Sequence, residues 1–282
     1  IRVPFHYEMT MAALNAGKHV FTEWPLGANL AEAEEMAELA RAKGVRTLAG
    51  MQRRCSPIYL RLKEMIEEGY IGEVVACNLS QMGTGGATRT SDRTWMRDVT
   101  KGANTMTISF GHVIDALSMC VGEIKDVSGV VSTQTTKWLE SDTRRFLDVT
   151  SPDNILVSGK LANGAVVSAN VGSQPTHGSG QRLEIYGREG TLVVEGSDSR
   201  LLGGKAGDTA LQEMEIPERL TWVPDNVPQG PAFNVAQMYR RFGEAICSGQ
   251  PAEPDFDTAV VRHKLLDAIQ RASEQGTRQY ID

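Results

Sequence analysis

The stretches V-F-T-E-W-P-L at residues 20–26 and G-M-Q-R-R-C-S-P at residues 50–57 decide the fold of this 282-residue chain. The segment between them predicts a helix over 30–43, with Asn29 as its N-cap and Gly44 as its stop. Strand, helix and strand in this order indicate an α/β unit with parallel strands. Ligands of such sheets bind beyond the carboxyl ends of the strands, so we expect one shared pocket at the two polar strand ends.

Outside this unit the pattern changes. Residues 1–5 predict the end of a strand, and a helix closed by Gly17 follows over 6–16. After residue 57 the regular alternation of strands and helices stops. Strands are predicted over 74–82, 125–133, 154–161, 165–171, 182–186 and 191–195, and helices over 56–69, 103–121, 232–248 and 257–274. We therefore expect an α/β part followed by an α+β part with an open-faced, mostly antiparallel sheet.

Composition narrows the classes of function. The net charge of -6 argues against a non-specific nucleic-acid binder. The sequence has no run of about eighteen apolar residues, so no membrane span is expected. The four cysteines are scattered without a C-x-x-C pair, which indicates no metal site, no disulfide scaffold and a cytoplasmic location. The chain opens inside an expected strand, at residues 1–4, and we expect an N-terminal portion to precede it.

Polar residues after the two strand ends are the first candidates for a binding site. Trp24 stands between Glu23 and Pro25, where its ring is placed to stack on a ligand; the alternative is a core tryptophan. Arg53 and Arg54 follow the next strand. An arginine pair suits phosphate or carboxylate groups, because guanidinium makes bidentate hydrogen bonds. The alternative for this pair is a solvated position or an ion pair at a domain interface.

Three histidines are candidates for chemistry. His112 and Asp115 are three residues apart in a predicted helix, so they share nearly the same face. A histidine there is suited to act as a general base, and the alternative is a helix histidine bonded to backbone or to the other domain. His6 follows the first expected strand, where it either touches a cofactor or caps the next helix. His177, in the loop over 175–178, is a further candidate for reaching a substrate.

Longer stretches of the chain resemble a known family. They are A-L-N-A-G-K-H-V-F-T-E-W-P-L at 13–26, the run from Gly-Met-Gln-Arg-Arg to Ile-Gly-Glu-Val at 50–74, F-G-H-V-I-D-A-L at 110–117 and L-L-D-A-I-Q-R-A at 265–272. In combination they are similar to the glucose-fructose oxidoreductase / inositol dehydrogenase / MocA family. The resemblance covers nearly the whole chain.

This resemblance implies an N-terminal Rossmann domain that binds NAD or NADP, represented here by residues 1–51, and a substrate and dimerisation domain over 52–282. It implies cofactor contacts from the residues at the strand ends, which are Pro4, His6, Glu23, Trp24, Pro25, Gln52 and Arg53. His112 would take a proton from a substrate hydroxyl, and Asp115 and His177 would contact the substrate. The family's glycine-rich loop and ribose-binding acid are not in the chain, so the choice between NAD and NADP stays open. The open sheet face implies a homodimer or homotetramer.

Two positions depart from the family pattern. The family's usual E-K-P motif is E-W-P at 23–25, and indole lacks the charge of the lysine. The aspartate that the family places four residues before the histidine is Ile108. Both departures resemble the branch of the fungal galactose-regulon repressor, which binds a nicotinamide dinucleotide but acts by binding a transcription activator. Arg97 and Lys101, in a predicted long loop over 83–101, are candidates for a replacement cation near the substrate.

Two functions follow from these observations. The first is an NAD(P)-dependent dehydrogenase that transfers hydride to or from a sugar, a polyol or a sugar derivative. The second is a non-catalytic, dinucleotide-binding regulator that holds a protein partner. We favour the enzyme, because this fold is more often catalytic than regulatory, and that preference rests on analogy.

Overall fold

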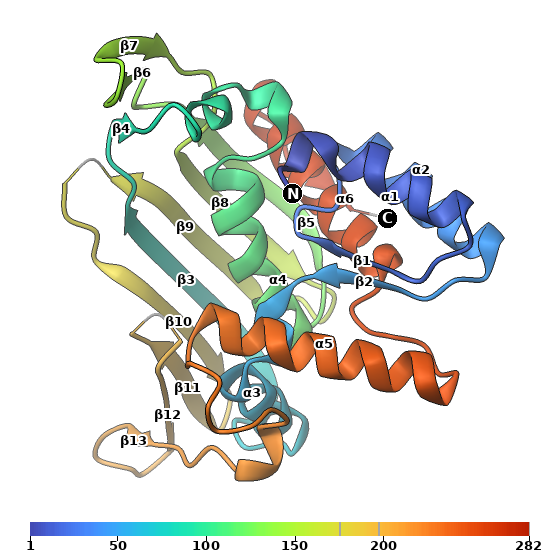
Figure 1. Cartoon of the computed structure of the whole chain (residues 1–282). Helices are drawn as coiled ribbons and strands as arrows, with labels where there is room; N and C mark the ends of the chain where they lie inside the picture. The colour runs from blue at the N-terminus through green and yellow to red at the C-terminus, as the bar shows by residue number, and fades with distance from the viewer. Residues whose placement is uncertain (175, 197, 282) are drawn as a thin grey trace.

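The α/β part of the chain contains a two-stranded sheet (Figure 1). The computed structural model of the whole chain describes residues 1–174, 176–196 and 198–281. The strands of this sheet, β1 (Val20–Glu23) and β2 (Thr47–Gly50), are parallel, as the sequence predicted. Between them runs α2 (Leu30–Lys43), and α1 (His6–Asn15) packs on α2 and β1. The carboxyl ends of both strands therefore lie side by side.

The predicted limits of α2 are confirmed. The Asn29 side chain accepts a hydrogen bond of 3.0 Å from the backbone N–H of Glu32, which is the N-cap interaction. Gly44 ends the helix in the left-handed conformation, with φ of 61°, where a side chain would be strained. Local capping chemistry is thus sufficient to place this helix.

The predicted strand over residues 1–5 is wrong. Val3–Phe5 instead form η1, a 3-10 turn that leads directly into α1. Pro4 lies at the first positions of this turn, where its fixed φ is favourable and its missing N–H costs nothing. In a strand the same proline would remove a ladder hydrogen bond, so the helical conformation is preferred.

A nine-stranded sheet forms the α+β part, in the order β13-β12-β11-β10-β3-β9-β8-β5-β14. Its strands are β3 (Val74–Thr84), β5 (Ile124–Ser132), β8 (Asn154–Leu161), β9 (Val166–Gln174), β10 (Gly180–Gly187), β11 (Gly190–Glu195), β12 (Arg200–Lys205), β13 (Gln212–Glu213) and β14 (Gln279–Tyr280). Among the described strands of this sheet, β3 and β9 are the one parallel pair. The mostly antiparallel sheet is therefore confirmed, and so is the hairpin at Asn163-Gly164 between β8 and β9.

Helices cover one face of this sheet and leave the other open (Figure 1). The π-helical segment η5 (Thr105–Phe110) contacts β8 and β9 and continues into α4 (Gly111–Val121). The helix predicted over 103–121 is therefore a π-helix followed by an α-helix. α3 (Pro57–Glu67) contacts β12. Along β8 buried residues such as Ile155 alternate with exposed ones such as Leu156, which separates the covered face from the open one.

The C-terminal helices return to the α/β part. α5 (Pro231–Ser248) contacts β2 and η2 (Gln52–Cys55), and α6 (Phe256–Gln275) contacts both α2 and β5. One continuous apolar core therefore contains residues of both parts. The domain limit between residues 51 and 52 stays a prediction. No helix in the described part of the chain has the length and apolarity needed to cross a bilayer.

A three-stranded sheet projects beyond the ends of β3 and β9 (Figure 1). It consists of β4 (Thr88–Arg89), β6 (Lys137–Glu140) and β7 (Arg145–Asp148). The predicted loop over 83–101 therefore holds a short strand and two turns, η3 (Thr94–Arg97) and η4 (Val99–Lys101). This extension forms one wall of the cavity described next.

Candidate active site

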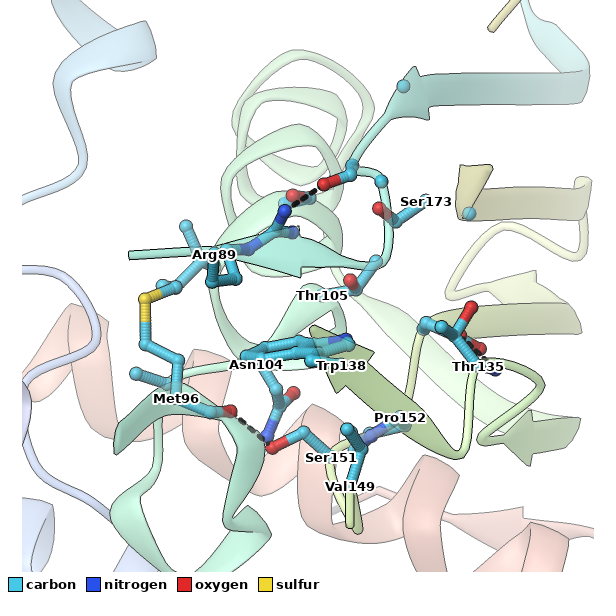
Figure 2. Close-up of a pocket in the computed structure, with 18 of the residues that line it drawn as sticks. Arg89, Met96, Asn104, Thr105, Thr135, Trp138, Val149, Ser151, Pro152 and Ser173 are labelled. Atoms are coloured by element: carbon cyan, nitrogen blue, oxygen red, sulfur yellow. Dashed lines mark hydrogen bonds between the residues drawn. The ribbon is translucent and has the colours of Figure 1, made fainter. Parts of the chain in front are cut away.

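A cavity of about 320 Å³ lies between the end of β3, the η5 segment and the three-stranded sheet (Figure 2). The ring of Trp138 forms part of its wall, beneath the guanidinium of Arg89, which lies 4.8 Å from the ring centroid. Hydroxyl and amide side chains complete the lining, and they include Gln81, Thr84, Asn104, Thr105, Ser109, Thr135, Ser151 and Ser173. An aromatic wall with convergent polar groups suits a small molecule with several hydroxyls.

His112 lies on α4, and it is not itself among the residues that line this cavity. Ile108 and Ser109, one turn earlier on the same helical path, contribute to the cavity wall. The half-buried imidazole has its Nδ1 atom buried and without a hydrogen-bond partner among the described residues. Burial and then the positive charge of Arg53 lower the pKa of His112 to about 4, against an opposing effect of Asp115. The imidazole is therefore neutral near pH 7 and can accept a proton.

A network of side chains holds Arg53 beside His112. Arg53 Nη1 donates to Gln181 Oε1 at 2.7 Å, and Arg53 Nε lies 3.2 Å from Asp198 Oδ2. Tyr59 donates to Asp198 at 2.9 Å and accepts from Gln181 at 3.0 Å. The four side chains come from η2, α3, β10 and the turn between β11 and β12, so distant segments fix the guanidinium in place. The alternative of a solvated Arg53 is not supported.

Three of the eight buried polar side-chain atoms that have no partner among the described residues belong to residues near this network. Apart from His112 Nδ1, they include Gln52 Oε1 and Gln81 Oε1, for which the described residues supply no donor. Gln52 precedes Arg53, and Gln81 faces Gln181 across the β3–β10 pairing while it also lines the cavity. Buried polar atoms in proteins are nearly always hydrogen-bonded. We therefore expect a ligand or ordered water to supply the missing donors here.

Trp24 belongs to the core rather than to a ligand pocket. Only 5% of its surface is exposed, its indole Nε1 donates to the carbonyl of Thr107 at 2.7 Å, and its ring packs on His263. A Cβ atom at Gly111 would lie 2.5 Å from this indole nitrogen, so the ring rests directly on the start of α4. The predicted stacking on a cofactor finds little free surface, and the core alternative describes Trp24 better.

The other residues predicted at the first strand ends have mixed environments. His6 is 2% exposed, and its ring nitrogens lie 2.9 Å from the carbonyl of Pro25 and 3.3 Å from that of Ile1. His6 links the start of α1 to the buried Pro25 loop, and Pro4 is part of η1. Glu23 is exposed as a residue, but its carboxyl packs over Gly50, and this burial raises the pKa of Glu23. The cofactor roles of these residues stay predictions.

Asp115 is part of a buried ion-pair cluster. Arg54 donates to both of its oxygens, at 2.8 and 2.9 Å, and Arg262 Nε lies 3.3 Å from Oδ1. Burial raises its pKa, but the two arginines outweigh this effect and hold the pKa of Asp115 below its ordinary value. A fully paired carboxylate that is 1% exposed is suited to hold structure, so its predicted contact with a substrate has no support in this geometry.

The three candidates from loops lie outside the cavity wall. Arg97 donates to the backbone carbonyl of Asp148 at 3.0 Å and thereby braces the three-stranded sheet. Lys101 and His177 are exposed, and none of the three is among the lining residues. Their contacts with a substrate stay predictions.

Sequence reasoning missed most of the residues that line the cavity. Arg89 lies inside the Gly/Thr/Arg-rich stretch whose length indicated function, and Ile108 was recognised as the position of the family's aspartate. Trp138, Asn104 and Gln81 have no motif or spacing that distinguishes them from ordinary residues of a strand or a helix cap. Tertiary structure alone brings them together.

Comparison with known proteins identifies the family of this chain. Residues 1–51 match the model "Oxidoreductase family, NAD-binding Rossmann fold", and residues 57–196 match the model of the Gal80p C-terminal domain. Dehydrogenase aclE of Aspergillus oryzae is 31% identical over 289 residues, which cover 98% of this chain and 75% of that protein. The chain belongs to the glucose-fructose oxidoreductase / inositol dehydrogenase / MocA family.

Two further members of this structural group are informative. The galactose/lactose metabolism regulatory protein GAL80 of Saccharomyces cerevisiae is 32% identical over 216 residues, covering 70% of this chain and 49% of that protein. A solved levoglucosan dehydrogenase, in complex with NADH and levoglucosan, shares the fold with a TM-score of 0.88 at 23% identity, over 100% of this chain and 78% of that one. The predicted family, its Gal80-like branch and its cofactor class, NAD or NADP, are confirmed by these matches.

Proposed function

We propose that this protein is an NAD(P)-dependent dehydrogenase that acts on a sugar, a polyol or a sugar derivative. The observation that carries this proposal is the buried Nδ1 atom of His112, which has no hydrogen-bond partner among the described residues. It lies one helical turn from a cavity lined by hydroxyl and amide groups. A general base needs such a free, neutral nitrogen within reach of its substrate.

The carboxyl end of β2 fits a nicotinamide cofactor better than that of β1, where Trp24 is bonded within the core. When bound, the nicotinamide ring donates or accepts the hydride. Gln52 follows the carboxyl end of β2 and has a buried acceptor atom without a donor among the described residues, which suits the N–H group of a carboxamide. We therefore assign residues 1–51 together with Gln52 to the cofactor and the remainder of 52–282 to the substrate.

Three side chains of this protein have separate roles in the proposed proton transfer and substrate binding. His112 Nδ1 accepts the proton of the substrate hydroxyl, a contribution worth about a hundred- to ten-thousandfold in rate. Arg53, fixed by Gln181 and Asp198, lowers the pKa of the imidazole, so it keeps the base neutral before the transfer and also makes it a weaker base. Gln81 Oε1 is an acceptor for a second substrate hydroxyl. Lysine and aspartate at the positions of Trp24 and Ile108 are not required by this scheme.

A regulator is the second candidate function. The match of residues 57–196 to the Gal80p C-terminal domain favours it. So do the buried Trp24 and the apolar Ile108, which stand where enzymes of the family have charged residues. Such a protein would use the same cleft to sense a dinucleotide and hold a protein partner.

The full-length protein distinguishes these functions in a turnover assay. We would follow reduced nicotinamide absorbance with NAD and with NADP against aldoses, polyols, inositols and sugar acids. We expect turnover with at least one substrate and a hundredfold or greater loss in His112→Ala, with cofactor binding retained. His19 is an exposed histidine directly before β1, where it accepts a hydrogen bond from the backbone of Arg46, so His19→Ala is the control variant and should keep its activity. Tight dinucleotide binding without any turnover would support the regulator instead.

We also propose that the open sheet face joins copies of this chain into a homodimer or homotetramer in the cytoplasm. Val130, Leu156 and Val166 on this face are exposed by 56%, 52% and 53%, which is more apolar surface than a free sheet usually shows to water. The molar mass in light scattering tests this assembly, and a monomer at micromolar concentration would contradict it.

A further inference from the structure

The charge of the cavity identifies the class of substrate that it suits. We infer that the substrate of the proposed dehydrogenase carries an oxyanion group, a carboxylate or a phosphate, and that Arg89 binds this group. The inference rests on the proposed function but uses residues that the proposed proton transfer does not involve. It separates sugar acids and sugar phosphates from neutral sugars and polyols.

Arg89 is held in place but keeps hydrogen-bond donors free. Its guanidinium lies over the ring of Trp138 (Figure 2), and its Nη1 donates to the carbonyls of Gly85 and Thr88. Nε and Nη2 have no acceptor among the described residues. These two atoms form the edge of a guanidinium that binds carboxylate or phosphate in a bidentate manner. A stacked, braced arginine loses little freedom when such a group binds.

No acid among the described residues forms an ion pair with Arg89. The acids of the three-stranded sheet have other partners, Glu140 with Arg145 and Asp148 with Lys137. Burial, and then the neighbouring charge of Arg93, lower the pKa of Arg89. An anion in the cavity would remove both penalties, since it would pair with a partly buried cation.

The remaining charges of the lining agree with this assignment. Arg93 is the second cation, and Asp153 is the one acid among the described lining residues. The oxygens of Asp153 already accept hydrogen bonds of 2.8 Å from Gln134 N, 2.7 Å from Thr135 N and 3.0 Å from Asn154 Nδ2. The described lining thus carries two cations and one carboxylate that is hydrogen-bonded by the protein, which gives it a net positive charge. Neutral sugars would gain nothing from this arrangement.

Matched pairs of substrates test the inference with the full-length protein and both dinucleotides. The pairs are D-glucuronate with D-glucose, D-galacturonate with D-galactose, and glucose 6-phosphate with glucose. We expect a kcat/KM at least tenfold higher for the anionic member of at least one pair, and the carboxylate and phosphate pairs tell the two groups apart. Arg89→Gln should lower kcat/KM for that anion by about ten- to a hundredfold, mainly through KM, and lower it at least fivefold less for the neutral partner.

Two further variants guard this test. Arg89→Lys keeps the charge without the planar fork, so it should recover part of the lost affinity and show that the cavity still folds. Lys137→Gln removes an exposed positive charge next to Trp138 on β6, where it pairs with Asp148, and should behave as the parent protein. If Lys137→Gln lowered kcat/KM for the anion as much as Arg89→Gln does, the inference would be overturned, because a general electrostatic effect of positive charge would then explain both losses.

The outcomes separate this inference from the proposed function. Turnover of neutral and anionic sugars with equal kcat/KM, unaffected by Arg89→Gln, overturns the inference while the dehydrogenase stands. If no sugar is turned over, calorimetric titration with glucuronate and with inorganic phosphate decides. Binding that Arg89→Gln weakens tenfold or more supports the anion site in a protein without this activity. Absence of binding overturns the inference together with the enzyme.

Discussion

His112 and Asp115 lie one turn apart on α4, but they differ in whether their polar atoms have hydrogen-bond partners. Asp115 is fully buried, and two arginines occupy its oxygens. His112 has a buried nitrogen with no partner among the described residues. The two consecutive arginines belong to different clusters in the same way. Arg54 pairs with Asp115, whereas the charge of Arg53 acts on His112. Two residues that share a helix face therefore belong to two different clusters.

The difference shows how a functional polar group can be told from a structural one. A buried charge that is completely paired already has its hydrogen bonds in the folded chain, so removing it harms the fold. A buried polar atom without a partner is unfavourable for the fold unless something else binds it. His112 and Asp115 thus differ in whether the chain supplies partners for their own polar atoms, although Arg262 Nη1 in the Asp115 cluster also has no partner among the described residues.

The largest expected effect comes from the paired side. Asp115→Ala leaves Arg54 and the fully buried Arg262 without their shared carboxylate. We expect a loss of about 3–5 kcal/mol in the free energy of unfolding, measured by urea denaturation. Glu73→Ala, which breaks an exposed pair with Arg188, should cost less than about 1 kcal/mol. Equal losses in the two variants would contradict a structural role for Asp115.

A smaller effect is expected where Trp24 meets α4. Gly111→Ala would place a methyl group 2.5 Å from the indole nitrogen, whose ring is fixed by its hydrogen bond to Thr107. We expect a loss of about 1–3 kcal/mol in the free energy of unfolding, because the core has no room to relax. Gly243→Ala, in an exposed part of α5 with open space at the Cβ position, should instead stabilise by up to about 1 kcal/mol. Stabilisation by both alanines would show that Trp24 does not press on α4.

Much of the fold could be predicted from local signals. Asn29 and Gly44 place α2, and Asn163-Gly164 places the hairpin between β8 and β9, because capping and turn preferences act on neighbouring residues. The failures have local causes as well. Pro4 favoured a helical turn where the end of a strand was predicted over residues 1–5. The short strands β4, β6 and β7 lack an apolar alternation long enough to notice.

The candidate site was much less predictable. Motifs led to His112 and Arg53, which the structure brings together, but also to Asp115, Trp24 and His6, whose polar atoms are paired within the chain. Residue type and spacing show that a side chain can hydrogen-bond, not whether the fold already supplies its partners. The cavity wall is assembled from segments more than sixty residues apart, such as Arg89 and Ser173, and no local pattern encodes that contact.

The smallest expected effect tests the unpaired side directly. With a pKa of about 4, His112 should stay neutral from pH 8 down to pH 5, so its NMR signals should not titrate near 6.5 and kcat/KM should show no His112 limb there. Histidine-labelled protein, with His112→Asn to assign the signal, measures this. Arg53→Gln removes the positive charge that helps to lower the pKa and should raise it toward 6.5, whereas Arg54→Gln, on the paired side, should move it less. If His112 titrates near 6.5 in the parent protein, burial and Arg53 do not set its charge, and the contrast with Asp115 loses its physical basis.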